Sequence, residues 1–403
     1  MVHQTISNKI NKAPSASSKS QVMNRLPSWT AMALIVGILA ACSSGPRPSA
    51  LPIHPAVVNQ QNEPKSEPGD SALPAQLQQT KSRWTPVAWS ELPGFGQDPL
   101  FEAWNAWLRS CERKVSAFVA LCPEVRRLSL GSQEEKIDWI KSRLQPYRVE
   151  SLQGGDEGLL TGYYEPMMEA SRLATSQFKV PLYQLPIGLG QRKPWYSREE
   201  IDTLPSVQAQ LRGRELAFLA DPIDALILQI QGSGRIRLLQ PDGSSRMIRL
   251  AYAGTNDQPY KSVGRWLLDQ GLVKDASWPG IKAWARQNPQ RVQEMLWSNP
   301  RTVFFREEAL LDPDSGPRGA QGVALTPGRS IAVDPLSIPY GTPVWISSTG
   351  AQINLQKLVM AQDTGSAIVG AVRADYFAGW GAPAGELAGR LKQRLQLWVL
   401  WPK

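Results

Sequence analysis

Short apolar runs broken by proline and glycine fill residues 159–250 and the last hundred residues of the sequence; the 403-residue chain holds 33 prolines and 32 glycines. Runs of this kind lie at residues 303–305, 343–346, 358–361 and 395–400. Such runs are typical of strands, and their mixed spacing favours barrels over a parallel α/β sheet. Residues 224–231 are interpreted as a further apolar strand. Residues 235–239 and 246–250 flank the turn Pro241-Asp242-Gly243 and predict a hairpin.

Three segments have helical spacing instead. Asp98-Pro99 predicts a helix cap and first turn, and apolar residues follow at helical intervals: Leu100, Trp104, Trp107, Leu108, Cys111, Val115 and Phe118. Residues 133–145 repeat the pattern, and helices return at 260–297. The fold class predicted from these patterns is mainly β with α, that is, α+β.

The N-terminal 41 residues have the features of a secretory signal peptide. Basic residues precede an apolar run at 31–41, which is too short for a membrane span of about 20 residues. Leu39-Ala40-Ala41-Cys42 resembles a bacterial lipobox, which implies a lipid on Cys42. The residue after Cys42 is Ser43 and not aspartate. The resemblance to lipoproteins then implies attachment to the outer membrane rather than the inner one. Residues 42–83, rich in Pro, Ser and Gln, are expected to form a disordered linker, with ordered sequence from about Trp84.

Charge and histidine content exclude several classes of function. The formal net charge is +9, and loss of residues 1–41, which carry four basic and no acidic side chains, lowers it to +5. This modest, scattered charge suits a polyanion such as murein but not a nucleic acid. The two histidines, His3 and His54, lie in the signal peptide and the linker. Ser-His-Asp and Cys-His catalysis and histidine-bound metals are therefore excluded, and neither a cofactor nor a metal is expected.

Cys111 and Cys122 remain after the anchor is set aside. A disulfide and two buried free thiols are equally consistent with the sequence.

Three aspartates end apolar runs in the C-terminal third: Asp334, Asp363 and Asp375. Asp363 follows a strand expected to be buried, and Thr364-Gly365 allows a sharp turn after it. Burial between apolar walls raises the pKa of a carboxyl and lets it act as an acid near neutral pH. The alternative is that all three are turn residues that cap loops.

The segments around these aspartates resemble the membrane-bound lytic murein transglycosylase A family. Residues 160–166, 230–235, 250–256 and 260–264 share the resemblance in the same order. It implies a catalytic double-psi β-barrel domain with helices from residues 84–162 and 300–403. It also implies a second, smaller β-barrel domain with flanking helices, inserted at residues 163–299.

The same resemblance implies cleavage of the β-1,4 bond between N-acetylmuramic acid and N-acetylglucosamine without water, forming 1,6-anhydromuramic ends. Asp363 would be the acid/base and Asp375 a supporting carboxylate, whereas Asp334 is either a third catalytic residue or a structural one. Glu165 is given no catalytic role. The expected substrate contacts are Thr161, Tyr163, Tyr164, Gln231, Gly232, Ser233, Tyr252 and Gly365. The expected partners are peptidoglycan glycan strands and, through Cys42, the periplasmic face of the outer membrane, with the protein a monomer.

Two other functions fit parts of the sequence. Asp363-Thr364-Gly365 is also the signature triplet of aspartic proteases, but their mechanism needs two aspartates that share one proton, and the sequence has no second triplet after an apolar strand. A non-catalytic murein-binding lipoprotein is the other alternative; such a protein would not need the carboxylate at 363.

Overall fold

The computed structural model describes residues 73–113, 117–351 and 353–403, and these belong to one compact unit. The predicted signal peptide, the lipid anchor at Cys42 and most of the linker lie outside the described residues. Within the described part, no helix combines the length and apolarity that a membrane span needs.

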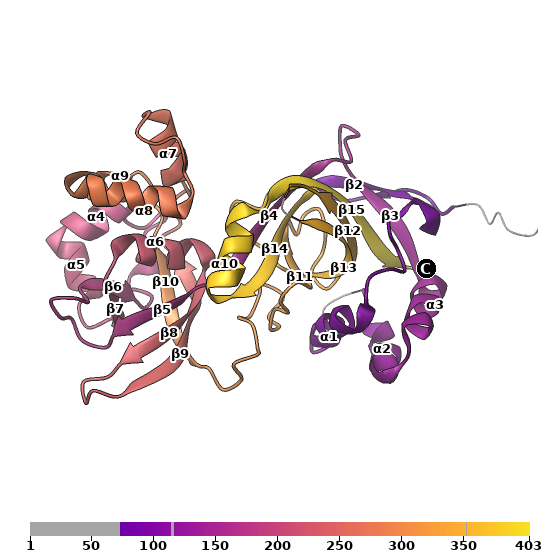
Figure 1. Ribbon diagram of the computed structural model, residues 1–403, viewed down its shortest axis with the longest axis horizontal. Coiled ribbons are helices and arrows are strands. Elements are labelled where there is room, and N and C mark those ends of the chain that lie inside the picture. The colour runs from indigo at the N-terminus through magenta and orange to yellow at the C-terminus, as the bar shows by residue number, and fades with distance from the viewer. Residues whose placement is uncertain (1–72, 114–116, 352) are drawn as a thin grey trace, which may run out of the picture. The chain divides into compact units, whose positions relative to one another are not determined.

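The larger sheet closes on itself (Figure 1). Its ring consists of β4 (Gly158–Glu165), β14 (Arg373–Trp380), β11 (Ser330–Val333), β13 (Asn354–Asp363), β12 (Pro343–Thr349) and β15 (Lys392–Pro402). The C-terminal strand β15 pairs with both β12 and β4 and so completes the ring. Buried Val, Ile and Leu side chains fill its core. The predicted barrel is therefore present.

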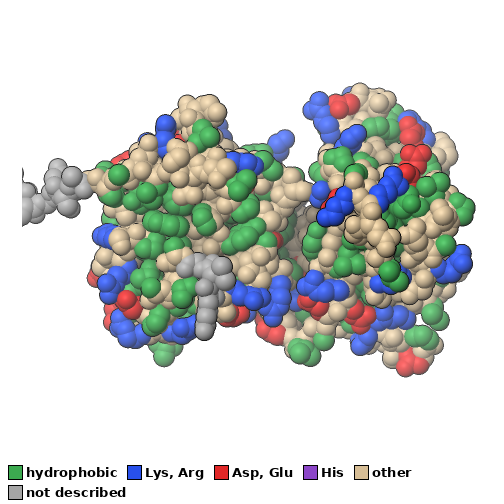
Figure 2. All heavy atoms as spheres, turned by 180° about the vertical axis from the view of Figure 1, so that it is seen from behind, with side chains coloured by type: hydrophobic (Ala, Val, Ile, Leu, Met, Phe, Trp, Pro, Cys, Tyr) green, Lys and Arg blue, Asp and Glu red, His purple; other side chains and the backbone are tan. Residues whose placement is uncertain are grey.

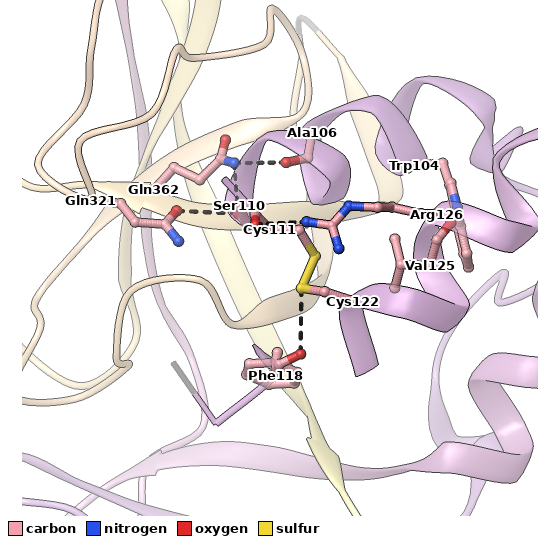
Figure 3. Close-up of a disulfide and its surroundings, with 10 residues drawn as sticks. All are labelled: Trp104, Ala106, Ser110, Cys111, Phe118, Cys122, Val125, Arg126, Gln321 and Gln362. Carbon is pink, nitrogen blue, oxygen red and sulfur yellow. Dashed lines mark hydrogen bonds between the residues drawn. A yellow bond between two sulfur atoms is a disulfide. The ribbon is translucent and has the colours of Figure 1, made fainter. Parts of the chain in front are cut away.

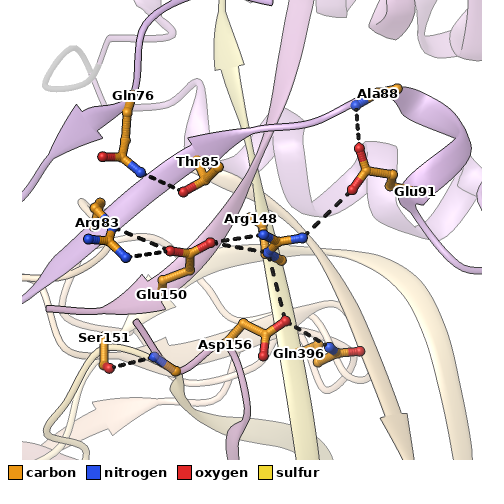
Figure 4. Close-up of polar contacts among 11 residues, drawn as sticks. Gln76, Arg83, Thr85, Ala88, Glu91, Arg148, Glu150, Ser151, Asp156 and Gln396 are labelled. Atoms are coloured by element: carbon orange, nitrogen blue, oxygen red, sulfur yellow. Dashed lines mark hydrogen bonds and ion pairs between the residues drawn. The ribbon is translucent and has the colours of Figure 1, made fainter. Parts of the chain in front are cut away.

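Three further strands extend this sheet from β15: β3 (Leu144–Ser151), β2 (Ser82–Pro86) and β1 (Leu77–Gln78). Arg83 and Arg148 both bind the carboxylate of Glu150, each with a shortest separation of 3.0 Å, and Arg148 also approaches Asp156, which accepts a hydrogen bond from Gln396 on β15 (Figure 4). The expected disorder up to residue 83 is wrong for this part, because β1 and β2 gain paired neighbours that the linker-like composition does not reveal.

A second, six-stranded sheet lies between β4 and β11 in the chain. Its order is β10 (Val303–Ala309), β9 (Ser245–Thr255), β8 (Ser233–Leu239), β5 (Met167–Ser171), β7 (Glu215–Leu219) and β6 (Val180–Tyr183). The hairpin β8–β9 is confirmed. The edge strands β10 and β6 contact each other, so the sheet curls towards closure.

The prediction of a strand at 224–231 is wrong: this segment is the helix α6 (Pro222–Gln231). Asp221 caps its start by accepting a hydrogen bond from the N–H of Ile223, and Gly232 ends it with φ +82°. Its buried residues, Ile223 and 225–228, form an almost unbroken run, so the sequence has no clear helical period to distinguish it from a buried strand.

Helices cover both sheets (Figure 1). Beside the barrel lie α1 (Leu100–Ser110), α2 (Cys122–Arg127) and α3 (Gln133–Arg143), while α10 (Gly381–Arg390) packs on β4 and β14. The inserted sheet is accompanied by α4 (Arg198–Thr203), α5 (Pro205–Leu211), α7 (Val263–Asp269), α8 (Trp278–Gln287) and α9 (Val292–Trp297). Trp104, Trp107 and Trp139 pack together with ring centroids 5.4–5.5 Å apart, so the tryptophans of α1 are core residues.

Helix α1 differs from its prediction at both ends. It ends at Ser110 rather than near Phe118, and Cys111 then forms a disulfide with Cys122 (Figure 3). Of the two possibilities for these cysteines, a disulfide or free thiols, the structure contains the disulfide. Asp98 does not cap the helix, because its carboxylate instead binds the buried guanidinium of Arg329 at 2.6 Å.

The chain passes from the barrel to the inserted sheet, and back again, at other residues than the predicted domain edges at 163 and 299. Strand β4 stays in the barrel to Glu165, and β10 pairs with β9 up to Ala309. Glu165 is fully buried at this change and binds Arg235 and Arg249 at 2.8 and 2.6 Å. Both arginines also donate to the carbonyl of Ser315. An acidic residue that sequence analysis left without a role thus joins the two sheets.

Candidate active site

Two of the three predicted aspartates lie in one row across the barrel. In the strand register, Ala332 on β11 is opposite Asp363 on β13 and also opposite Asp375 on β14, and Asp375 is opposite Thr161 on β4. Residues opposite one another on adjacent strands project from the same face of a sheet. The register shifts between Ile331 and Ala332, and such irregularities often re-aim a side chain. The barrel therefore presents two carboxylates on either side of a small alanine.

Asp363 receives hydrogen bonds on both carboxylate oxygens. The hydroxyl of Tyr163 donates to Oδ2 at 2.8 Å, and the backbone N–H of Ala320 donates to Oδ1 at 2.9 Å. Burial raises the pKa of Asp363 to about 6, with a smaller contribution from the charge of Asp375, although the hydrogen bonds from Ala320, Thr364 and Tyr163 oppose the shift. This pKa lets one carboxyl exist in both protonation states near neutral pH, as an acid that later acts as a base requires.

Asp375 has a different environment. The hydroxyl of Thr161 donates to its Oδ1 at 2.5 Å, and Arg373 donates to the oxygen of Thr161 at 2.7 Å. Burial gives the pKa of Asp375 a net rise, which the Thr161 hydrogen bond and the charge of Arg373 oppose only in part. Burial lowers the pKa of Arg373, and the charge of Asp375 opposes that. The guanidinium and hydroxyl thus support the charged form of Asp375.

Tyr163 connects the barrel strand β4 to Asp363. Its ring packs against Phe377 at 5.3 Å, which fixes the direction of the hydroxyl. Burial and the adjacent charge of Asp363 raise the pKa of Tyr163 well above its ordinary value. The phenol therefore remains a hydrogen-bond donor throughout the physiological pH range.

The end of α1 binds two segments that position Asp363: the strand β13 and the loop that contains Ala320 (Figure 3). Gln362, which is fully buried, donates to the carbonyl of Ala106 and to Ser110 Oγ, both at 2.8 Å. Ser110 Oγ in turn donates to Gln321 at 3.1 Å. The loop that supplies the Ala320 N–H and the strand that carries Asp363 are therefore attached to the same helix end, beside the disulfide.

A cavity of about 720 Å³ opens over Asp363 and Asp375, with walls from both the barrel and the inserted domain. Predicted contacts that line it are Tyr163, Gln231, Gly232, Ser233, Tyr252 and Gly365. Tyr252 is half exposed and offers the flat apolar face and polar tip that sugar rings contact. A groove of this volume suits an oligosaccharide.

Three predicted site residues do not line this cavity in the described part. Thr161 acts through Asp375. Tyr164 uses its backbone N–H to position Gln231, donating to Oε1 at 3.1 Å. Asp334 is not brought together with the other aspartates. Its carboxylate, 3% exposed as a residue, accepts bonds from Lys81 and from the N–H groups of Leu336 and Gly370.

Sequence analysis missed Ala320, Arg113 and Arg318. Ala320 acts through a backbone N–H, which every non-proline residue carries, so its side chain gives no signal. The two arginines lie far from Asp363 in the sequence, and nothing in their local patterns indicates that they reach the cavity.

Most residues of this site lie in segments that match known protein families. The family description "MltA specific insert domain" matches residues 159–306, and "3D domain" matches residues 329–401. The membrane-bound lytic murein transglycosylase A of Vibrio cholerae is 33% identical over 264 residues, which cover 62% of this chain and 67% of that protein. The chain thus spans about two thirds of the length of the curated relatives it matches.

Two solved structures extend the likeness. The lytic transglycosylase LtgG of Burkholderia pseudomallei is 43% identical, with a TM-score of 0.56, and the match covers 79% of this chain and 95% of that one. MltA of Neisseria gonorrhoeae is 29% identical, with a TM-score of 0.67, and the match covers 82% and 96% of the two chains. These likenesses confirm the predicted fold of a barrel with an inserted domain.

Proposed function

Since the chain belongs to the membrane-bound lytic murein transglycosylase A family, a group of enzymes that act on peptidoglycan, we propose that Asp363 is its single acid/base. The observation that carries this proposal is the position of Asp363. It ends a barrel strand, faces the cavity, and has a pKa raised by burial to about 6.

In the first half of the reaction, protonated Asp363 donates its proton to the oxygen that joins C1 of N-acetylmuramic acid to N-acetylglucosamine. The C1–O bond breaks, the N-acetylglucosamine leaves with a new hydroxyl, and positive charge develops at C1. Tyr163 and the N–H of Ala320 hold the carboxyl in position and stabilise the carboxylate that forms.

In the second half, the Asp363 carboxylate accepts the proton of the muramyl C6 hydroxyl as that oxygen bonds to C1. The product is a 1,6-anhydro ring, and Asp363 returns to its protonated form. An ordinary glycosidase needs a second carboxylate as nucleophile or base. Here the nucleophile is part of the substrate and has a high effective concentration, so one acid/base suffices.

Asp375 has a supporting role in this scheme. Its Thr161 and Arg373 partners favour the ionised form, which stabilises positive charge at C1 and helps to keep Asp363 protonated. An aspartic protease mechanism is not favoured. The two aspartates flank Ala332 on separate strands, and each has its own hydroxyl donor instead of a shared proton.

The relatives' names describe them as membrane-bound, and membrane association applies to this enzyme too. The attachment proposed here is a lipid on Cys42 in the outer membrane, with the catalytic part in the periplasm as a monomer. The lipobox-like sequence at 39–42 supports it. Two or more acyl chains give a stable anchor.

Digestion of purified murein tests the reaction. The wild-type enzyme should release anhydromuropeptides, whereas Asp363→Asn should release none. Asp269→Asn removes an exposed carboxylate outside the cavity and serves as the matched control, with wild-type activity. Products with a reducing muramic end, heavier by the mass of one water (about 18 Da), would identify a hydrolase and refute the transglycosylase reaction.

A further inference from the structure

Two arginines meet on one backbone carbonyl beside Asp363. Arg113 donates to the oxygen of Gly322 from Nε at 3.1 Å and from Nη2 at 2.9 Å, and Arg318 donates to the same oxygen at 3.0 Å. Arg113 follows the end of α1, whereas Arg318 belongs to the loop before β11. Both line the cavity that contains Asp363.

The backbone at Gly322 is adapted to this contact. Its φ of +83° is one that residues with a side chain rarely adopt. A Cβ there would also lie 2.6 Å from Arg113 Nη2. Glycine at position 322 therefore permits the guanidinium of Arg113 to lie directly on the backbone. The side chains of Arg113 and Arg318 are thus held in a defined geometry by the Gly322 carbonyl.

Neither guanidinium has a carboxylate partner among the described residues, whereas many other arginines of the protein do. On the face shown in Figure 2, Lys and Arg side chains are mostly interspersed with Asp and Glu. Two like charges on one carbonyl repel each other, and an anion bound between them would offset this repulsion. The carbonyl engages only part of each guanidinium, so N–H groups of both remain available.

The loop that carries Arg318 runs beside the reacting centre. Arg318 and Gly322 bracket the loop in which the N–H of Ala320 donates to Asp363. A Cβ built on Gly319 would lie 3.2 Å from Cβ of Asp363. An anion on the two arginines would therefore lie in the same cavity as the bond that Asp363 cleaves.

From this arrangement we infer that Arg113 and Arg318 form a binding site for a carboxylate on the substituent of the muramyl residue. This inference rests on the proposed function and deepens it, because it assigns a preference for anionic over neutral glycan. A guanidinium can bind a carboxylate with two parallel hydrogen bonds, which adds direction as well as affinity. The carboxylate is either that of the lactyl group or one in the attached peptide.

The test compares three ligands. Soluble strands that carry peptides present peptide carboxylates, amidase-treated strands present free lactyl carboxylates, and chitohexaose is neutral. The double variant Arg113→Gln/Arg318→Gln is compared with Arg237→Gln/Arg394→Gln, which removes the same charge from exposed residues outside the cavity. KM and kcat are measured for the strands. The Kd of all three ligands is measured on an Asp363→Asn background, where no cleavage occurs.

The cavity variant should weaken binding of an anionic strand roughly tenfold, with the loss in KM more than in kcat. Binding of chitohexaose and all values of the control variant should change less than twofold. A loss with peptide-bearing strands alone identifies a peptide carboxylate, and a loss with amidase-treated strands identifies the lactyl group. Both outcomes support the site.

Equal weakening of chitohexaose binding would mean that the arginines only hold the loop, and would overturn the inference. An unchanged Kd for both anionic strands would overturn it as well. Failure of the wild-type enzyme to form anhydromuramic ends would refute the proposed function instead. The affinities on the Asp363→Asn background would still decide the role of the arginines.

Discussion

The phenol of Tyr163 donates a hydrogen bond to Oδ2 of Asp363 at 2.8 Å, from a strand 200 residues earlier in the chain. This bond favours the ionised carboxylate and so opposes the burial that raises the pKa of Asp363. The position of this pKa is therefore set jointly by β4 and β13, and each contribution can be altered separately.

Tyr163→Phe should shift the alkaline limb of the pH dependence of kcat/KM to higher pH. The substitution removes the hydrogen bond that lowers the pKa of Asp363 but keeps the ring that packs on Phe377. Murein digestion followed over a pH series measures this shift. A uniform loss of rate with an unchanged pH profile would mean that the hydroxyl contacts substrate and does not tune Asp363.

Asp363→Asn should stabilise the protein at pH 8 by about 3 kcal/mol but leave its stability unchanged at pH 3. The folded pKa of about 6 lies above the ordinary value of 3.8, so the fold favours the protonated carboxyl. The resulting stabilisation is fully present below the ordinary pKa and is lost as the pH rises through 6. Urea unfolding at both pH values measures the difference. The same effect at both would contradict the burial argument.

Asp334→Asn should destabilise the fold by about 1–3 kcal/mol without a change in kcat/KM of the remaining folded enzyme. Burial alone would raise the pKa of Asp334, but hydrogen bonds from Gly370, Lys81 and Leu336 give a net lowering. The carboxylate therefore contributes stability above its ordinary pKa, and this is lost as the pH falls through the folded value. Loss of turnover at wild-type stability would restore Asp334 as a catalytic residue.

Glu165→Ala should destabilise the protein by about 3–5 kcal/mol, because it leaves the buried guanidinium groups of Arg235 and Arg249 without their carboxylate. Glu169→Ala is the control. Glu169 pairs with Arg237 at the surface, where both side chains are more than half exposed, and its loss should cost under about 1 kcal/mol. Denaturant unfolding compares the two variants, and equal effects would refute a special role for the buried cluster.

Cys111→Ser/Cys122→Ser should lower the free energy of unfolding by up to about 3 kcal/mol, since the disulfide closes a short loop. The helix end that it holds also binds Gln362 and Gln321 through Ser110. Unfolding midpoints with and without a reductant check the effect. The wild-type enzyme should approach the variant when reduced, and a variant that remains sensitive to reductant would contradict the assignment.

Much of the fold was predictable because strand alternation and turn residues are local signals. The hairpin β8–β9 and the strand that ends at Asp363 are examples, whereas Asp375 lies near the start of its strand and does not end one. Local signals failed where the buried residues form an almost unbroken run in the sequence, as they do in α6. They also failed at β1 and β2, whose order depends on strand pairing.

The site was predictable only in part, for a related reason. The segments carrying Asp363 and Asp375 could be recognised, but the register that places both opposite Ala332 depends on pairing between distant strands. Asp334 resembles them in sequence and differs in its neighbours, because Lys81 and two backbone N–H groups occupy its oxygens. The Ala320 donor and the Arg113–Arg318 pair depend on loops whose course the sequence patterns do not reveal.

The barrel is closed by β15, which pairs with β4, the strand that precedes the inserted domain in the sequence. Thr161, the partner of Asp375, thus gains its cross-strand neighbour Lys392 only when β15 has been synthesised. Contacts of such long sequence separation form late in folding, since the intervening chain must first be brought together. A nascent or truncated chain without β15 would therefore lack the finished catalytic row, and synthesis itself would delay the activity of an enzyme able to breach the wall of its own cell.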